Sequence, residues 1–397
     1  MAKIMTKYSV WIVGGLLAGI YWWGVKNMFF HQDDLDWFLL GQKPFWQVMG
    51  SPIGDHVNYV FRLLLKLEWE LFQLYFPLYL MVSVVMHAIN IWLIYKLGTA
   101  ISGRRDLSAL AALLFTINTN WTEVVLWTSG QTISITAIFV LLAMYNIWKK
   151  RGEVVSLLMA SSTSALALGL LGSTGVVYKK MRWQVVLIMA VVGVIYAWKG
   201  TDGTAIAYSL DWLIKVGAVW GLMMINSVMG RLIIPFDRFE MIRIVSVIGL
   251  ATLGLWKWRT SLGQIWRDNW SRFLIIQIAL YQLIVAVGRA QYGVGIMRAE
   301  RYSYLGLALL LLLGVRSLRK VKLGKWVWIV PVIVFMQCMG LYTRARAYVV
   351  RPQQMRQLFE EVKIADPKNI DPESYLPHFV LNDERLKYSD LLLLIND

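Results

Sequence analysis

Cysteine and charged residues are scarce in this 397-residue chain. Its one cysteine, Cys338, lies in an apolar segment, which excludes both a disulfide framework and a thiolate metal site. Glycine-rich phosphate loops of the GxGxxG and Walker types are also missing, so nucleotide-driven chemistry has no support. Charged residues make up only 16% of the chain and hydrophobic residues 58%, whereas soluble domains have about 25% and about 45–50%. The sequence therefore predicts an all-α, polytopic integral membrane protein.

Charged residues divide the chain into about eleven apolar segments, each expected to form a membrane span. The first is interpreted as a retained helix, because no small-residue cleavage site follows it. The fifth is long for one helix and short for two, so a single span and a re-entrant pair both stay open. The expected spans are 8–25, 77–97, 107–119, 130–147, 154–178, 183–199, 211–230, 242–256, 273–289, 302–316 and 326–343.

The positive charges predict the orientation, because Lys and Arg favour cytoplasmic loops. They place the N terminus in the cytoplasm and the C terminus outside, in a cell inner or plasma membrane. Lys179, Lys180 and Arg182 do not fit, since the count of spans puts them outside and their charge is typical of a cytoplasmic loop. The net charge of +16 suits such loops and anionic lipids, and it requires no nucleic acid.

Two polar regions flank or interrupt the membrane domain, which is expected over 1–343. The outer loop 26–76 is predicted to hold a short helix over 34–40 and an amphipathic interfacial helix over 58–76. Apolar residues of the second helix recur at helical spacing, and its charged residues Arg62, Lys66, Glu68 and Glu70 are expected on other faces. The tail 344–397 is too short to bury much core alone, so it should dock on the outer face or on a partner.

Three carboxylates, Asp33, Asp34 and Asp36, follow the first span within four positions. Acidic residues at a membrane are costly to bury, so chemistry or cation binding is a common reason for them. A hydrated loop that keeps the helix end in water is the alternative. Glu123, between Trp121 and Trp127, is expected to bind a divalent cation together with the aspartates, or else to pair with Lys or Arg.

Two histidines are weaker candidates. His56 is a weak metal signal, because no second histidine stands at ligand spacing from it. His87 and Asn90 lie three positions apart inside a span, where polar residues most often hydrogen-bond a neighbouring helix. We therefore expect this pair to be structural.

Several stretches occur in a characteristic order: Asp33-Asp34, Gly54-Asp55-His56-Val57-Asn58 before Leu71–Phe76, His87-Ala88-Ile89-Asn90, Trp121-Thr122-Glu123-Val124 with Trp127-Thr128-Ser129-Gly130, and Glu300-Arg301-Tyr302-Ser303-Tyr304 preceded by Arg231–Pro235. Together, over residues 8 to 343, they resemble the membrane glycosyltransferases with the GT-C fold. The nearest branch is the protein-O-mannosyltransferase-like group, whose longer members carry tetratricopeptide repeats. The family's eleven spans, inside N terminus and outside C terminus agree with the topology expected from charge.

The resemblance implies transfer of a sugar from a polyprenyl-phosphate donor to a protein or glycan acceptor at the extracytoplasmic face. Asp33 or Asp34, with Asp34 preferred, would take the proton of the acceptor hydroxyl. Arg301, Tyr302, Arg298 and Arg231 are expected to bind the carrier phosphate, because a guanidinium can hold two phosphate oxygens at once. Ordinary lipid phosphate is the alternative ligand. His56, Glu123 and Trp127 are the expected substrate or acceptor contacts. A divalent cation held by Asp33, Asp34 and Glu123 is the one cofactor left open.

The chain also departs from the family. Its Asn118–Glu123 stretch lacks both histidines and the proline of the family's HPxHTE motif, and Gln131 replaces the arginine that commonly follows Ser-Gly. Gly306 stands in place of the usual proline, and the repeats are absent. A catalytically inactive GT-C-like subunit that scaffolds a membrane complex therefore stays open. A transporter of anionic substrates is less favoured, because Lys215 is nearly the only charge within the spans.

Overall fold

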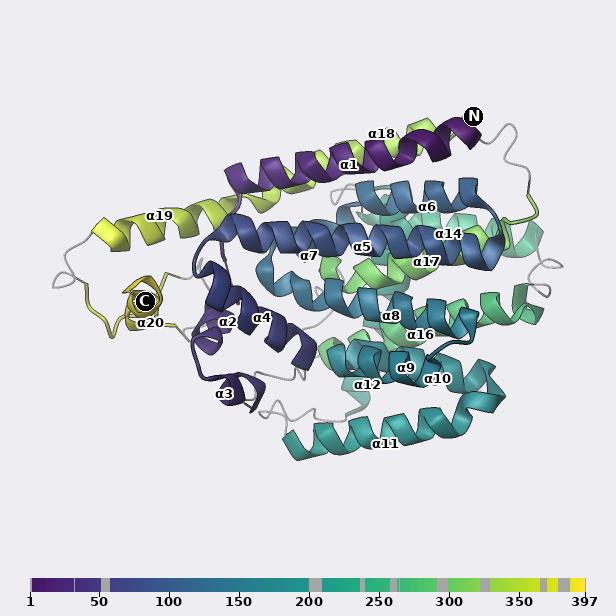
Figure 1. The fold of residues 1–397 in the computed structure, drawn as a ribbon. Helices are drawn as coiled ribbons and strands as arrows, with labels where there is room; N and C mark the ends of the chain where they lie inside the picture. The colour runs from purple at the N-terminus through teal and green to yellow at the C-terminus, as the bar shows by residue number, and fades with distance from the viewer. Residues whose placement is uncertain are drawn as a thin grey trace.

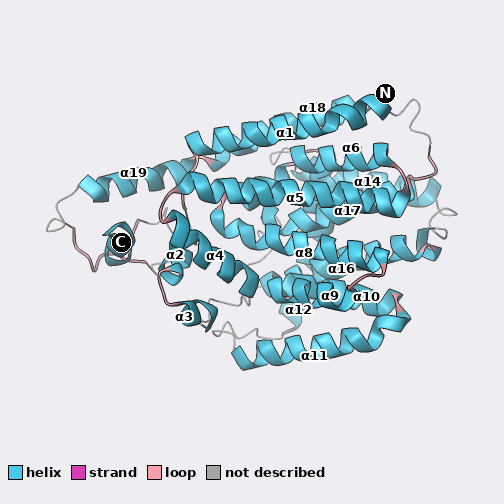
Figure 2. Cartoon of the chain, in the orientation of Figure 1, coloured by secondary structure: helices cyan, strands magenta, loops and turns pink. Residues whose placement is uncertain are grey.

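The computed structural model describes residues 2–31, 33–50, 58–199, 209–235, 240–257, 263, 265–290, 299–321, 329–364, 370–377 and 386–396. This part of the chain is helical, and it contains no strand beyond one antiparallel bridge between Tyr375 and Lys387 (Figure 2). Long helices lie roughly along one direction, and short helices gather at one end of the bundle (Figure 1). The all-helical expectation is confirmed.

Twelve of the described helices make up the body of the bundle. They are α1 (Ala2–Asn27), α5 (Phe76–Ser102), α6 (Arg105–Ile117), α8 (Gln131–Lys149), α9 (Glu153–Thr163), α10 (Leu168–Val177), α11 (Arg182–Lys199), α12 (Leu210–Leu222), α14 (Glu240–Lys257), α16 (Asn269–Arg289), α17 (Tyr304–Ser317) and α18 (Ile329–Tyr348).

Shorter elements connect these helices or cover the end of the bundle. They are α2 (Asp34–Gly41), α3 (Phe45–Gly50), α4 (Tyr59–Phe72), α7 (Thr122–Leu126), α13 (Arg231–Ile233), α19 (Val350–Ile364), α20 (Tyr388–Asn396), the 3₁₀ turns η1 (Thr119–Trp121), η2 (Thr128–Gly130), η3 (Ala165–Ala167), η4 (Lys179–Met181) and η9 (Glu300–Ser303), and the π-helical stretch η5 (Met223–Gly230).

Three helices in the described residues are long and apolar enough to cross a membrane: Phe76–Ser102, Thr128–Lys149 and Asn269–Arg289. A fourth candidate is the pair Arg105–Ile117 and Thr119–Leu126, which is bent by 57° at its break. These helices indicate a membrane protein, whereas the number of eleven spans stays a prediction.

The segment 154–178 forms two short helices rather than one span. Ser164 between them has an extended backbone, and its side-chain hydroxyl accepts a hydrogen bond from the Leu166 amide at 3.2 Å. Trp148 at the end of α8 and Tyr178 after α10 both contact the ring of Trp270, at centroid distances of 5.2 and 6.2 Å. The chain therefore returns to the end of the bundle from which it started, as a re-entrant pair does. Lys179 and Lys180 therefore lie at the same end of the bundle as Lys149.

Asp268 ties helices together at that same end. Its carboxylate caps α16 by accepting from the Ser271 amide at 3.0 Å and hydroxyl at 2.8 Å. It also binds the Arg316 guanidinium from α17 at 2.5 and 2.9 Å, and that guanidinium donates to the Ile101 carbonyl of α5. The hydrogen bonds from Arg316 hold the pKa of Asp268 well below its usual range.

The amphipathic helix expected over 58–76 is α4, but its faces differ from the prediction. Phe61, Leu65 and Trp69, which belong to the apolar residues at helical spacing, are buried in the protein. Arg62 and Glu68, which were expected on other faces, are each only 1% exposed, so that expectation was wrong. The exposed apolar stripe is instead Leu63, Leu67 and Leu71, spaced by four residues. The sequence could not show which face of α4 is buried, because that depends on the helices around it. The side of α4 that carries Arg62 and Glu68 packs against other parts of the protein; the helices in contact with α4 are α2, α3, α5, α8 and α9.

The tail docks on the end of the bundle through α19. Arg356 donates to the carbonyls of Met28 at 2.5 Å, Lys26 at 3.3 Å and Val25 at 3.4 Å, which are at the C-terminus of α1. Carbonyls at a helix end have no partner within the helix, and a cation there also offsets the negative end of the helix dipole. Phe359 adds an edge-on contact with Phe29 at 5.2 Å.

Gly130 gives a test of the packing that joins η2 to α7. A methyl group added there would overlap the Glu123 carbonyl oxygen and lie 2.8 Å from Cα of Val124, both of them backbone atoms. We expect Gly130→Ala to lower the free energy of unfolding by about 1–3 kcal/mol, as overpacking does. Gly288 in α16 is the control, because nothing lies within 4 Å of its added methyl. Thermal unfolding of detergent-purified Gly130→Ala and Gly288→Ala measures the stability of each variant. If the two variants are equally stable, the tight packing of η2 on α7 is contradicted.

Candidate functional site

Asp34 is a fully buried carboxylate at the start of α2. Its Oδ1 accepts hydrogen bonds from the backbone amide of Ser129 at 2.9 Å and from the Ser129 hydroxyl at 2.8 Å. Its Oδ2 accepts from the backbone amide of His31 at 3.1 Å. Burial raises the pKa of Asp34 to about 7, although these hydrogen bonds act in the opposite direction. A carboxyl group with a pKa near neutrality suits general-base chemistry.

The neighbouring carboxylates are placed differently. Asp33 stands just before α2 without a side-chain capping hydrogen bond, and both Asp33 and Asp36 are only partly buried. Of the three acidic residues in this segment, Asp34 is therefore the one that is fully buried.

Trp127 joins the acidic segment to the rest of the site. Its indole Nε1 donates to the carbonyl oxygen of His31 at 3.2 Å. The guanidinium of Arg301 lies over the Trp127 ring, 4.8 Å from the ring centroid, and 4.9 Å from that of Tyr302. One side of the indole thus contacts the Asp34 segment, while its face carries the cation.

Glu123 forms ion pairs with arginines from two different elements. Its Oε2 accepts from the backbone amide and from Nη1 of Arg301, both at 3.3 Å. Its Oε1 lies 3.7 Å from Nη2 of Arg344 in α18. This is the ion-paired alternative for Glu123. Among the described residues, no three His, Cys, Asp or Glu side chains gather around a possible metal position, so Asp33, Asp34 and Glu123 do not assemble a cation site.

The remaining phosphate candidates are spread more widely. Tyr302 is buried beneath Arg301, and its ring also lies 5.7 Å from the Arg289 guanidinium. Arg231 is buried at the start of α13, where its carbonyl accepts from Gln337 at 2.9 Å. Gln337 in turn accepts from Asn118 at 2.9 Å, in the stretch that lacks the family's histidines. Arg298 and His56 lie outside the described residues.

His87 and Asn90 form a structural cluster, as expected from their position in a span. The Tyr304 hydroxyl lies 2.8 Å from Nδ1 of His87 and 3.2 Å from Nδ2 of Asn90. Asn90 also donates to the Ser134 carbonyl at 3.0 Å. Side chains from α5, α8 and α17 are thus joined by hydrogen bonds in the interior of the bundle.

Four residues of this neighbourhood had no role in the sequence-based prediction. Ser129 stood within a quoted motif and His31 lies two residues before another, but nothing in the sequence showed that both bind Asp34. Arg344 and Tyr348 belong to the last turns of α18, and Tyr348 places its hydroxyl 3.3 Å from Nε2 of His31. Burial lowers the pKa of His31 to about 4, so its ring is neutral at physiological pH.

The described contacts make one continuous set from Asp34 through Ser129 and Trp127 to Arg301 and Glu123. It combines a proton acceptor, an aromatic surface and a guanidinium. Such a set can take up a proton at Asp34 and hold an anionic group at Arg301. No protein-family model, curated protein or solved structure matches this chain.

Proposed function

We propose that this chain is a GT-C-like membrane glycosyltransferase with about eleven spans, a cytoplasmic N terminus and an extracytoplasmic C terminus. It would move a sugar from a polyprenyl-phosphate donor to a protein or glycan acceptor at the outer membrane face. The observation that carries the proposal is the position of Trp127, which contacts the Asp34 segment through its indole N–H and Arg301 through its ring.

In the proposed reaction, Asp34 accepts the hydroxyl proton of the acceptor while the acceptor oxygen attacks the anomeric carbon of the sugar. The bond between that carbon and the phosphate oxygen breaks, and the phosphate leaves with the electron pair. Arg301 would stabilise the charge that grows on the departing phosphate, which helps the transition state more than the ground state.

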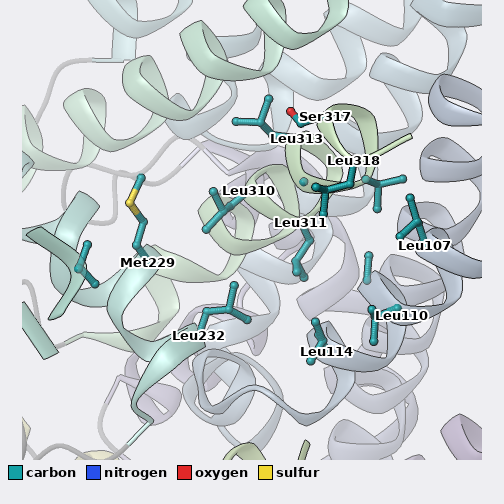
Figure 3. Close-up of a pocket in the computed structure, with 14 residues that line it drawn as sticks. Leu107, Leu110, Leu114, Met229, Leu232, Leu310, Leu311, Leu313, Ser317 and Leu318 are labelled. Carbon is teal, nitrogen blue, oxygen red and sulfur yellow. The ribbon is translucent and has the colours of Figure 1, made fainter. Parts of the chain in front are cut away.

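An apolar groove of about 490 Å³ supports a donor with a hydrocarbon tail. It lies between α6, α14, α17, η5 and α13, and Figure 3 shows its aliphatic lining. Ser317 is the one polar residue of that lining, and Leu232, directly after the phosphate candidate Arg231, contributes to the wall. Aliphatic walls of this kind favour an isoprenoid chain over a polar ligand.

A catalytically inactive scaffold subunit is the second candidate. The hydrogen bond between Asn118 and Gln337 occupies the stretch where the family has its histidines. The two arginines on Glu123 likewise leave that carboxylate paired within the protein. Sugar transfer from a polyprenyl-phosphate donor in proteoliposomes separates the two candidates, because only a transferase gives turnover.

Asp34→Asn should reduce sugar transfer by about 10²–10⁴-fold, the usual contribution of a general base. The asparagine keeps the size of the side chain but cannot take the proton. In the unaltered protein, transfer should rise with pH through about 7, because the base acts only when ionised. Asp33→Asn is the matched control and should stay near the unaltered rate. Equal turnover of both variants and the parent would remove Asp34 from the chemistry.

Arg301→Ala should weaken transfer more than Arg301→Lys, since lysine keeps the charge and loses the two-pronged geometry. The measurement is the initial rate of transfer at several donor concentrations. Arg346→Ala is the control, because that arginine is exposed and contacts only the Tyr342 ring and hydroxyl in the described interactions. If the donor phosphate binds elsewhere, Arg301→Ala, Arg301→Lys and Arg346→Ala should all transfer sugar at the same rate.

A further inference from the structure

A second buried carboxyl group lies close to Asp34. Glu68 of α4 is 1% exposed, and its Oε1 accepts a hydrogen bond from Nε2 of Gln131 at 3.1 Å. Gln131 is two residues after Ser129, which binds Asp34. A single short stretch of backbone, Ser129-Gly130-Gln131, therefore holds one carboxyl at each end.

The surroundings of Glu68 contain polar atoms without partners. Oε2 of Glu68, Oε1 of Gln131 and the Tyr79 hydroxyl are all buried, and the structure gives them no hydrogen-bond partner among the described residues. Two of these three atoms can only accept when Glu68 is ionised. A proton on Glu68 turns one acceptor into a donor, which lowers the cost of burying the group.

The nearby cations are engaged elsewhere. On α4 itself, Arg62 donates to the Val48 carbonyl at 3.1 Å, and Lys66 binds Glu70 at 2.5 Å and the Gly41 carbonyl at 2.9 Å. Five described elements pack against α4, and four of them carry ionisable side chains. These are Asp34 and Asp36 of α2, Tyr79, His87, Tyr95 and Lys96 of α5, Tyr145 and Lys149 of α8, and Glu153 of α9. His87 lies two turns beyond Tyr79 and contacts the Tyr304 hydroxyl at 2.8 Å.

We propose that Asp34 and Glu68 form a proton-sharing pair, in which Glu68 holds the proton and Asp34 is the ionised member. Two carboxylates in one buried neighbourhood disfavour joint ionisation, and the member with fewer hydrogen-bond donors keeps the proton. Asp34 has three donated hydrogen bonds and Glu68 has one. The pair exists whether or not sugar is transferred; its use in setting the charge of the base rests on the proposed function.

The titration directions agree with this arrangement. Burial raises the pKa of Glu68 to about 8, the hydrogen bond from Gln131 opposes that rise, and the charge of Asp34 adds to it. In the unfolded chain a glutamate has a pKa of about 4.3. The folded protein therefore binds more protons between these values, so its stability falls as pH rises toward about 8.

The test is infrared spectroscopy of the detergent-purified protein, which detects protonated carboxyl groups directly. On going from about pH 6 to about pH 9, the unaltered protein should lose protonated-carboxyl absorption in two steps, Asp34 first and Glu68 second, and Glu68→Gln should lack the band that is lost second. Glu70→Gln, an exposed neighbour on the same helix, should keep that band. Asp34→Asn should keep it too, but shift its loss to lower pH, because the like charge is gone.

Thermal unfolding over the same pH range gives a second readout. The melting temperature should decline less with pH in Glu68→Gln than in Glu70→Gln. A band unchanged by Glu68→Gln, or a titration unmoved by Asp34→Asn, would overturn the pair; if Glu68→Gln does not fold, Asp34→Asn and Glu70→Gln decide. Neither measurement uses a sugar donor, so failure of the pair and failure of the transferase proposal are separate outcomes.

Discussion

The burial of Asp34 without a cation beside it is the constraint on which the site depends. A carboxylate removed from water is costly, and here the hydrogen bonds from His31 and Ser129 compensate in place of an ion pair. Those donors stay in position only because η2 packs tightly on α7 and because Trp127 is tied to the His31 carbonyl. The helices around this point fix the geometry of a short, irregular loop, where the polar chemistry is concentrated.

Much of the helical framework follows from the sequence, because apolar segments bounded by charge specify helices without reference to neighbours. The helix over 34–40 and the helix within 58–76 were predictable for this reason. The hydrogen-bonding role of His87 and Asn90 was predictable because polar side chains inside an apolar helix need a partner on a neighbouring helix. The burial of Arg62 and Glu68 was not, because the exposed face of α4 is apolar and only packing reveals which polar flank meets protein. Arg344 was missed because its contact with Glu123 joins residues far apart in the chain.

The segment 154–178 shows what a count of apolar segments leaves out. It forms two short helices, and the contacts of Trp148 and Tyr178 with Trp270 bring Lys179 and Lys180 to the end of the bundle where Lys149 lies. Hydropathy measures length and composition, and it does not distinguish one crossing from two short helices that turn back. The Lys and Arg residues of a loop instead indicate on which side of the membrane that loop lies.

The clasp of Arg356 on the end of α1 has a consequence for the order in which the protein matures. Its hydrogen bond to the Lys26 carbonyl joins residues 330 positions apart. A ribosome must therefore make most of the chain before the first helix receives its terminal cation. Until then the His31 ring lacks its contact with the Tyr348 hydroxyl, and Glu123 lacks its ion pair with Arg344. The hydrogen bonds on Asp34 can form once Ser129 has been made, so the last helices close over a site whose buried carboxyl already has its partners.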